Sequence, residues 1–246
     1  MSIPLWTPSE AFKQASGLAA YMRWLADTRG LVFDDYAALW RWSVEHLEDF
    51  WASMWDYFQI QSSAPYTRVL GRREMPGATW FEGARMNYAE HVFRMANEHP
   101  ALYFRSETVP DEVWSWAELH RAVASVAASL REMGIGVGDR VVAYVPNTPH
   151  AVIAFLACAS LGAVWSSCSP YIGAVSVIDR FTQIEPSVLF AIDGYVYNGK
   201  PFDRADVVDD LRKALPTLRQ VIHIPYLHAP DAPATLARQA LPRTRA

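Results

Sequence analysis

The stretch that decides the fold runs from Asp139 to Lys200 and reads DRVVAYVPNTPHAVIAFLACASLGAVWSSCSPYIGAVSVIDRFTQIEPSVLFAIDGYVYNGK. Short apolar runs predict three strands, at 141–145, 163–167 and 188–192. Longer segments between them predict two helices, at 148–161 and 174–184. Because strands alternate with helices, we expect right-handed crossovers and a mostly parallel sheet.

The same alternation continues on both sides of this stretch. Downstream we expect a polar loop over Asp193 to Phe202, followed by a helix at 203–215 and a strand at 220–224. Upstream, strands at 101–105 and 112–116 predict a hairpin, and Ser115 with Glu118 forms a capping box for a helix that runs to about residue 133. The fold class is therefore α/β, a layered β-α-β sheet preceded by an N-terminal segment of different character.

Three glycines in Gly134 to Asp139 resemble a phosphate-binding loop but stand in the wrong context. A dinucleotide fingerprint follows a strand and opens a helix, whereas this one follows a helix and opens a strand. We interpret it as a glycine helix stop followed by a turn.

Tryptophan marks the N-terminal segment, since seven of the ten lie within the first 80 residues. The apolar residues from Phe50 to Phe58 recur at helical spacing, and Asp34 or Asp35 can cap another helix. We expect these aromatics to form core or docking surface rather than a ligand cage, because no polar groups converge on them. Residues 65–88 carry many Pro and Gly and predict an irregular extended segment.

Three regions follow from these patterns. We expect a Trp-rich cap at 1–97, an α/β domain at 98–227, and a disordered tail at 228–246 that is rich in Ala, Pro and Arg.

Composition excludes several classes of protein. A net charge of −4 with interspersed signs argues against a nucleic-acid or membrane partner. Cys158 and Cys168 show no metal-ligand spacing, and the N-terminus resembles no secretory signal. We therefore expect a cytoplasmic protein with reduced cysteines and no metal site.

Several motifs resemble acyl-adenylate-forming (AMP-binding) enzymes. The run WSWAELH at 114–120 and the stretch from Gly136 to Trp165 are similar to acyl-CoA synthetases in general. Narrower elements resemble acetoacetyl-CoA synthetases: LWRWSVEHLEDFWASMWDYF at 39–58, WFEGARMNYAEHVF at 80–93, WSSCSP at 165–170, DRFTQIEP at 179–186 and DGYVYNGK at 193–200.

This resemblance implies an ATP-dependent ligase that joins acetoacetate to CoA through an acyl-adenylate, with ATP, Mg²⁺ and CoA as its small-molecule partners. Such enzymes need a glycine-rich loop with a lysine for the phosphates and a catalytic lysine from a mobile C-terminal domain. Neither motif occurs in the 246 residues, so no catalytic residue is assigned. We expect the chain to be an incomplete N-terminal part, truncated and inactive by itself, with a face exposed for association.

The resemblance places one binding contact in this chain. Two basic residues of related enzymes reach the 3′-phosphate of CoA, and the matching positions here are Tyr197 and Lys200. A solvated loop lysine is the alternative. Tyr171-Ile172 stands where the narrower family tends to have Asp-Phe, near the expected path of the CoA thiol. Cys168 has no neighbouring base, so packing is a better explanation for it than catalysis.

Two other functions remain open at this point. The chain could belong to a ligase for another short acid, such as acetate or propionate. It could instead be a non-enzymatic remnant or half of a split enzyme, since an exposed apolar face favours association.

Overall fold

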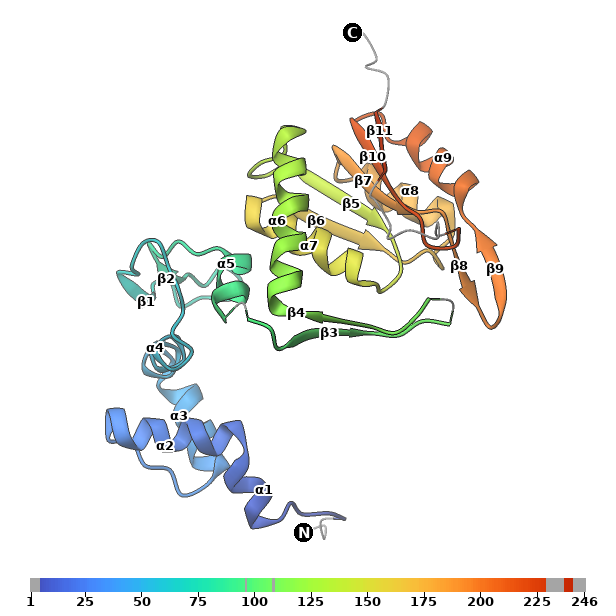
Figure 1. Cartoon of the computed structure of the whole chain (residues 1–246). Helices are drawn as coiled ribbons and strands as arrows, with labels where there is room; N and C mark the ends of the chain where they lie inside the picture. Colours follow the sequence, from blue (N-terminus) through green and yellow to red (C-terminus); the bar gives the residue numbers. More distant parts are fainter. Residues whose placement is uncertain (1–4, 96, 108, 229–236, 241–246) are drawn as a thin grey trace. The chain divides into compact units, whose positions relative to one another are not determined.

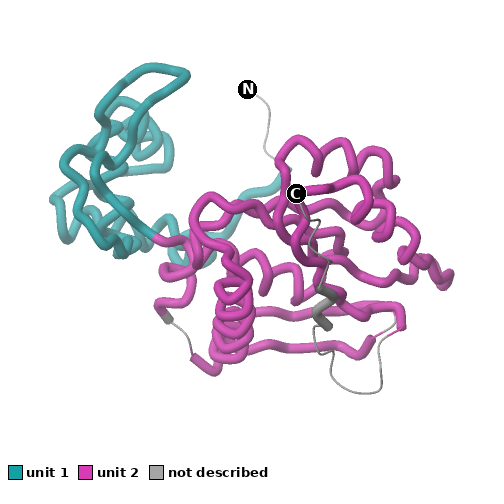
Figure 2. Tube along the Cα trace, turned by 90° about the horizontal axis from the view of Figure 1, so that it is seen from above, with its two compact units in different colours: residues 1–86 teal, residues 87–246 magenta. Residues whose placement is uncertain are grey.

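The structure is a computed structural model that describes residues 5–95, 97–107, 109–228 and 237–240. It divides into two compact units, residues 1–86 and residues 87–246, which Figure 2 shows in different colours. In the described ranges, no helix has the length and apolar character needed to cross a membrane.

The first unit is mainly helical. Its elements are α1 (Glu10–Ala15), α2 (Gly17–Arg29), α3 (Tyr36–Glu45), α4 (Leu47–Tyr57), β1 (Arg68–Leu70) and β2 (Trp80–Glu82). The side chains of Ser9, Ser16 and Asp35 accept backbone N–H bonds and cap the first three helices. Asp35 is thus one of the two caps that the sequence predicted.

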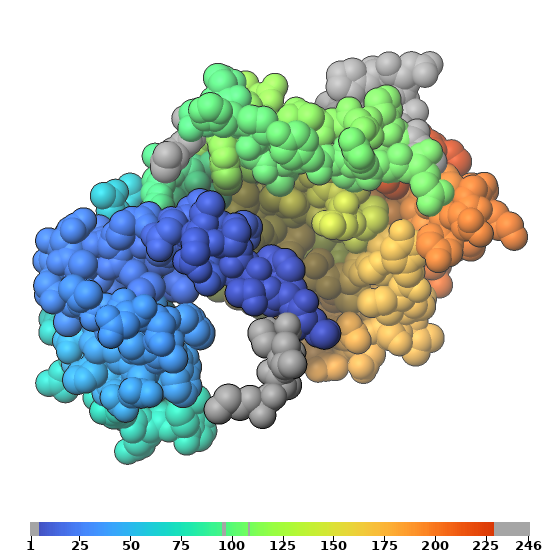
Figure 3. Space-filling view, turned by 90° about the horizontal axis from the view of Figure 1, so that it is seen from below, coloured from blue at the N-terminus to red at the C-terminus, as the bar shows by residue number. Residues whose placement is uncertain are grey.

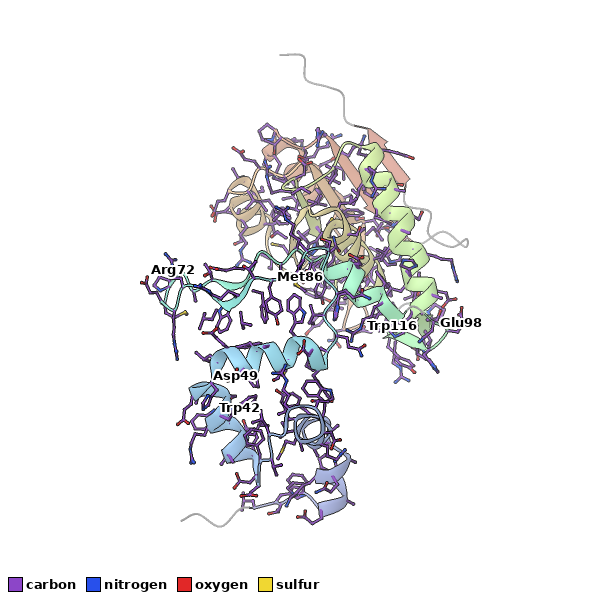
Figure 4. All side chains as sticks on the ribbon, turned by 90° about the vertical axis from the view of Figure 1, so that its left-hand side faces the viewer. Trp42, Asp49, Arg72, Met86, Glu98 and Trp116 are labelled. Atoms are coloured by element: carbon purple, nitrogen blue, oxygen red, sulfur yellow. The ribbon has the colours of Figure 1, made fainter. Side chains whose placement is uncertain are left out.

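An aromatic cluster holds these helices together. Tyr21, Leu25 and Leu39 are buried at its centre, and aromatic residues including Trp24 and Trp42 pack around them. Figure 4 labels Trp42 among the side chains of this unit. Trp55 lies against Tyr66 and Phe81 with ring centroids 5.2 and 4.6 Å away. Large aromatic rings thus pack against one another throughout this unit.

The segment expected to be irregular, residues 65–88, contains a short antiparallel pair. β1 and β2 pair Arg68 with Glu82 and Leu70 with Trp80. The expectation missed these strands because Gly71, Pro76 and Gly77, which suggested a loop, lie in the connection between the two strands.

The second unit contains the α/β layers. Its elements in chain order are α5 (Tyr88–Val92), the 3₁₀ turn η1 (Phe93–Met95), β3 (Pro100–Phe104), β4 (Glu112–Ser115), α6 (Trp116–Glu132), β5 (Arg140–Tyr144), α7 (Pro149–Leu161), β6 (Val164–Cys168), α8 (Ala174–Thr182), β7 (Val188–Ile192), β8 (Gly194–Tyr197), β9 (Lys200–Asp203), α9 (Ala205–Ala214), β10 (Gln220–Ile224) and β11 (Ala237–Ala240).

The main sheet has the strand order β11-β10-β7-β5-β6. β10, β7, β5 and β6 are parallel to their neighbours, and β11 is antiparallel at the edge. Helices α6 and α7 cover one face, and α8 and α9 cover the other (Figure 1). This arrangement confirms the predicted α/β fold with a mostly parallel sheet.

Side-chain alternation along β5 explains the two layers. Val141 and Ala143 pack with the α6–α7 side, whereas Val142 and Tyr144 pack with the α8–α9 side. All four are at most 1% exposed. A strand covered on both faces needs apolar residues at every position, which is why this run reads as continuous rather than alternating.

The predicted helix signals are confirmed. Ser115 and Glu118 make both reciprocal bonds of the capping box, and the Ser115 hydroxyl also donates to Glu98 Oε2 at 3.3 Å. Figure 4 labels Glu98 and Trp116 at this end of α6. Gly162 ends α7 in the left-handed conformation.

The boundary between the units lies between residues 86 and 87, earlier than the boundary after residue 97 that we expected from composition. The side chain of Asn87 donates to the carbonyls of Ala159 and Ser160 at the end of α7. Tyr88 lies 5.9 Å from Phe155 of the same helix. α5 therefore packs with the α/β unit, although we expected it to belong to the cap at 1–97.

The tail at 228–246 differs in part from the expected disorder. Ala237–Ala240 forms β11, which pairs with residues 220–223 of β10. The backbone N–H of His228 donates to Asp193. The rest of the expected tail lies outside the described residues.

Candidate functional site

The carboxyl ends of the parallel strands meet at one edge of the second unit. β5 ends at Tyr144, β6 leads into the turn at 169–173, and β7 leads into the segment that begins at Asp193. Ligands of open α/β sheets bind at this kind of edge. The two site residues predicted from the sequence, Tyr197 and Lys200, both follow β7.

The segment from Asp193 to Phe202 is a β-hairpin rather than the polar loop that we expected. β8 and β9 are antiparallel, with Gly194 opposite Asp203 and Tyr197 opposite Lys200. Asn198 and Gly199 form the turn with φ of 51° and 71°, the conformation of a type I′ hairpin turn. The Asn-Gly pair at 198–199 was the sequence signal for this hairpin, and it was overlooked.

The hairpin turn brings Tyr197 and Lys200 together as a cross-strand pair. Both residues are exposed, Tyr197 to 60%. Their side chains therefore lie next to the turn of the hairpin, where an anionic group in solution can reach them.

Tyrosine rings connect the hairpin with the turn after β6. The Tyr171 ring lies 4.5 Å from the Tyr195 ring and 6.0 Å from the Tyr197 ring, both edge to face. Partial desolvation, and then the neighbouring Tyr195, raise the pKa of Tyr171. Tyr171, one of the two positions that depart from the narrower family pattern, is thus part of this aromatic cluster.

A second hairpin contacts the tip of the first. Figures 1 and 3 show the β3–β4 hairpin extending across this unit toward β8–β9. The Gly199 N–H donates to Glu107 Oε2 at 3.3 Å, and the hydroxyls of Ser106 and Tyr226 are 2.8 Å apart. The Gly199 N–H, directly before Lys200, therefore already donates to the Glu107 carboxylate, which would compete with a phosphate for this N–H.

Asp193 anchors the base of the hairpin. Its carboxylate accepts the backbone N–H groups of Tyr226, Leu227 and His228 at 2.8, 2.8 and 2.9 Å. The chain after β10 passes so close to Gly194 that an added Cβ would lie 2.5 Å from Leu227 and 2.6 Å from the Phe202 carbonyl. The DG pair at 193–194 is therefore required by local packing.

Both cysteines are buried. Cys168 is 4% exposed and packs in the α8–α9 layer, as the sequence favoured. Burial raises the pKa of Cys158 to about 12, so its thiol stays protonated. Burial lowers the pKa of His150, which lies at the start of α7 and keeps a neutral ring.

The Gly134–Asp139 segment confirms the helix-stop interpretation. Gly134 has φ of 76° just after α6, and the Asp139 carboxylate accepts the Gly136 N–H at 2.8 Å. The Gly136 N–H therefore donates within the turn and is not available to a phosphate. Over the described ranges, no group of three or more His, Cys, Asp or Glu side chains is placed to hold a metal ion.

A cavity of about 440 Å³ lies between α6, α7 and the sheet face. Its lining is mostly apolar and includes Trp114, His150, Phe190 and Ile222. Tyr197 and Lys200, the predicted CoA contacts, do not line this cavity, so the cavity and the hairpin are separate features of this unit.

Comparisons with known proteins agree with the motifs. Residues 89–245 match the family model described as "AMP-binding enzyme", and residues 36–92 match "Acetyl-coenzyme A synthetase N-terminus". A solved acetoacetyl-CoA synthetase from Streptomyces lividans has 48% identity and a TM-score of 0.89, covering 98% of this chain and 40% of that chain.

Curated relatives give the same result. An acetoacetyl-CoA synthetase of Macaca fascicularis is 41% identical over 90% of this chain and 32% of its own length. One from Rhizobium meliloti is 37% identical over 91% of this chain and 34% of its own length. The chain thus spans about a third of the length of the curated relatives it matches.

Proposed function

This chain belongs to the AMP-binding enzyme family, and on that premise we propose that it forms part of an ATP-dependent ligase that converts acetoacetate and CoA to acetoacetyl-CoA. One observation carries this proposal: the 48% identity and TM-score of 0.89 to the S. lividans acetoacetyl-CoA synthetase over 98% of the chain. The reaction would proceed by attack of the acetoacetate carboxylate on the α-phosphorus of ATP, followed by displacement of AMP by the CoA thiolate. We place this activity in the cytoplasm.

The residues present fit the partners of this reaction unequally. ATP needs a glycine-rich loop with a lysine, and the sequence has none. Mg²⁺, which would neutralise phosphate charge, has no acidic cluster in the described part of the chain. We therefore assign to this chain the sheet scaffold and a part of the CoA site, and we expect no adenylation by the 246 residues alone.

For CoA, we propose that the Lys200 ammonium contacts the 3′-phosphate and that the Tyr197 hydroxyl donates to it. Their pairing across the hairpin turn and their exposure support this assignment. CoA should bind more tightly than dephospho-CoA by about two- to fivefold at low salt, the value of one exposed ion pair. Lys200→Ala should remove this difference, whereas Lys213→Ala on α9 should keep it. Equal binding of both ligands to the unaltered chain would exclude the phosphate contact.

The scaffold role can be tested with a chimera. In the S. lividans enzyme, the part that this chain matches is replaced by residues 1–246, and ATP–pyrophosphate exchange is measured with acetoacetate. We expect exchange by the chimera and none by the isolated chain. A folded chimera without exchange would favour a non-enzymatic chain. Robust exchange by the isolated chain would refute our assignment of the ATP site to other residues.

Acid specificity needs a different measurement, because the chimera takes the rest of its sequence from the S. lividans enzyme. Any downstream reading frame of the same gene region can be co-expressed with this chain. Exchange that is faster with acetoacetate than with acetate or propionate is expected. The reverse order would identify a ligase for another short acid, and activity only in the co-expressed pair would identify a split enzyme.

A further inference from the structure

The side chain of Arg204 connects two segments that are distant in sequence. Arg204 directly follows β9 and is partly buried. Its Nη2 donates to the Tyr195 hydroxyl at 2.8 Å, which ties it to β8. Its Nε donates to the Pro170 carbonyl at 3.1 Å, which ties it to the turn after β6. A third donor, Nη1, bonds to the Asp203 carbonyl at 3.0 Å.

Aromatic rings enclose the same guanidinium. Its central carbon lies 4.9 Å from the Tyr195 ring centroid and 5.8 Å from the Phe202 centroid. These two rings are stacked, with centroids 5.2 Å apart and an interplanar angle of 16°. Cation–π attraction therefore adds to the hydrogen bonds and holds β8 and β9 on one side of the guanidinium.

The turn at 169–173, which Arg204 joins to the hairpin, is itself hydrogen-bonded to the sheet. The hydroxyl of Tyr144, at the end of β5, donates to Pro170 O at 3.0 Å and to Ile172 O at 3.3 Å. Tyr144 is 1% exposed. Pro170 thus accepts bonds from Tyr144 and from Arg204, so that the carbonyl joins the rigid sheet to the hairpin.

We propose that Arg204 is a positioning residue that clamps the β8–β9 hairpin to the turn at 169–173. The clamp thereby sets the place of Tyr197 beside Tyr171, and with it the place of Lys200, the cross-strand partner of Tyr197. The clamp rests on contacts of this chain, whereas its effect on ligand binding rests on the proposed CoA function. Arginine suits this place because its planar fork presents diverging donors. The ammonium group of lysine is a single point and cannot reach Pro170 O and the Tyr195 hydroxyl with the same geometry.

The clamp is tested without any ligand, by amide hydrogen exchange of the full chain. Arg204→Ala should raise exchange in both the 194–203 and the 169–173 segments, including the Ile172 N–H that bonds to Ser169 O. The expected increase is roughly tenfold, which corresponds to the loss of about 1.4 kcal/mol of local stability. Arg204→Lys should give an intermediate increase. Arg212→Ala, on an exposed part of α9, is the matched control and should change neither segment.

Three results would overturn the clamp. The first is an increase confined to the hairpin, because the turn would then not depend on Arg204. The second is an equal increase in the Arg212→Ala control, because the effect would then come from general destabilisation. The third is unchanged exchange in Arg204→Ala.

Ligand preference then separates positioning from simple stability. In Arg204→Ala, the preference for CoA over dephospho-CoA should fall from about two- to fivefold to near unity, whereas a purely structural role would lower stability and leave this ratio intact. Arg204→Lys should restore part of the preference. If the unaltered chain shows no preference, the CoA assignment of Lys200 fails, while the exchange experiment still decides whether the clamp exists.

Discussion

Replacing Asp193 should destabilise the second unit more than any exposed carboxylate would. The Asp193 carboxylate accepts three backbone N–H groups, from Tyr226, Leu227 and His228, at 2.8 to 2.9 Å. Each such bond contributes about 1 kcal/mol, and an N–H left unpaired in a partly buried site adds a penalty. We therefore expect Asp193→Ala to lower the free energy of unfolding by about 2–3 kcal/mol.

Asp193→Asn provides a graded test of this reasoning. Oδ1 accepts from both Tyr226 and Leu227, whereas Oδ2 accepts only from His228. An asparagine can keep the oxygen that makes two bonds and lose the one that makes a single bond. The expected cost is about 1 kcal/mol, the value of one lost hydrogen bond. Asp210→Ala on α9 is the control and should cost less than about 0.5 kcal/mol, because its ion pair with Lys213 is exposed.

The assay must follow the second unit alone, because two units can unfold separately. Urea dependence of hydrogen exchange in β7 and β10 serves this purpose. Equal stability of Asp193→Ala and the unaltered chain would refute the anchoring role. An Asp193→Asn variant as unstable as the alanine variant would show that charge, rather than the three bonds, is the source of stability.

Three further predictions concern buried and strained positions. At pH 8 only about one Cys158 thiol in ten thousand is ionised, because its pKa is about 12. A thiol reagent should therefore modify Cys158 in the unfolded chain but not in the folded one, and modification of the native protein within minutes would contradict this. Burial lowers the pKa of His150, so its stabilising contribution is present above about pH 6.5 and is lost as the pH falls below that value. Between pH 7.5 and 5, His150→Gln should therefore lose less unfolding free energy than the unaltered chain, and an equal loss would exclude His150 as the source. Gly199→Ala should lower the local stability of the hairpin by about 1 kcal/mol through backbone strain alone, because φ is 71° and no atom lies within 4 Å of an added Cβ. Amide exchange in β8–β9 should become faster, and unchanged exchange would argue against the type I′ turn.

Local patterns predicted the α/β layers well. The strand Val188–Ile192 was predicted with the bounds that the structure shows, because a short run of five apolar residues is typical of a strand covered on both faces. The capping box at Ser115 was also correct, since both of its bonds join residues three apart. In such segments the forces that choose the structure act between near neighbours.

Two antiparallel pairs, β1–β2 and β8–β9, were not predicted from the sequence. β8–β9 carried a recognisable Asn-Gly turn, yet the polar residues around it favoured a loop. β1 and β2 pair across a connection rich in Gly and Pro, and no short-range pattern links them. Pairing between distant strands depends on packing against other elements, which composition does not reveal.

The candidate site divides in the same way. By itself the sequence determined the sheet and the family, and it led to the prediction that Lys200 and Tyr197 contact the 3′-phosphate of CoA. Only the tertiary structure showed that these two residues face each other across a two-residue turn, that Glu107 occupies the neighbouring N–H, and that Arg204 joins the hairpin to Pro170. The physical reason is range: periodicity and capping act within a few residues, whereas Arg204 and Glu107 act on groups 34 and 92 positions away, which only the folded backbone brings within reach.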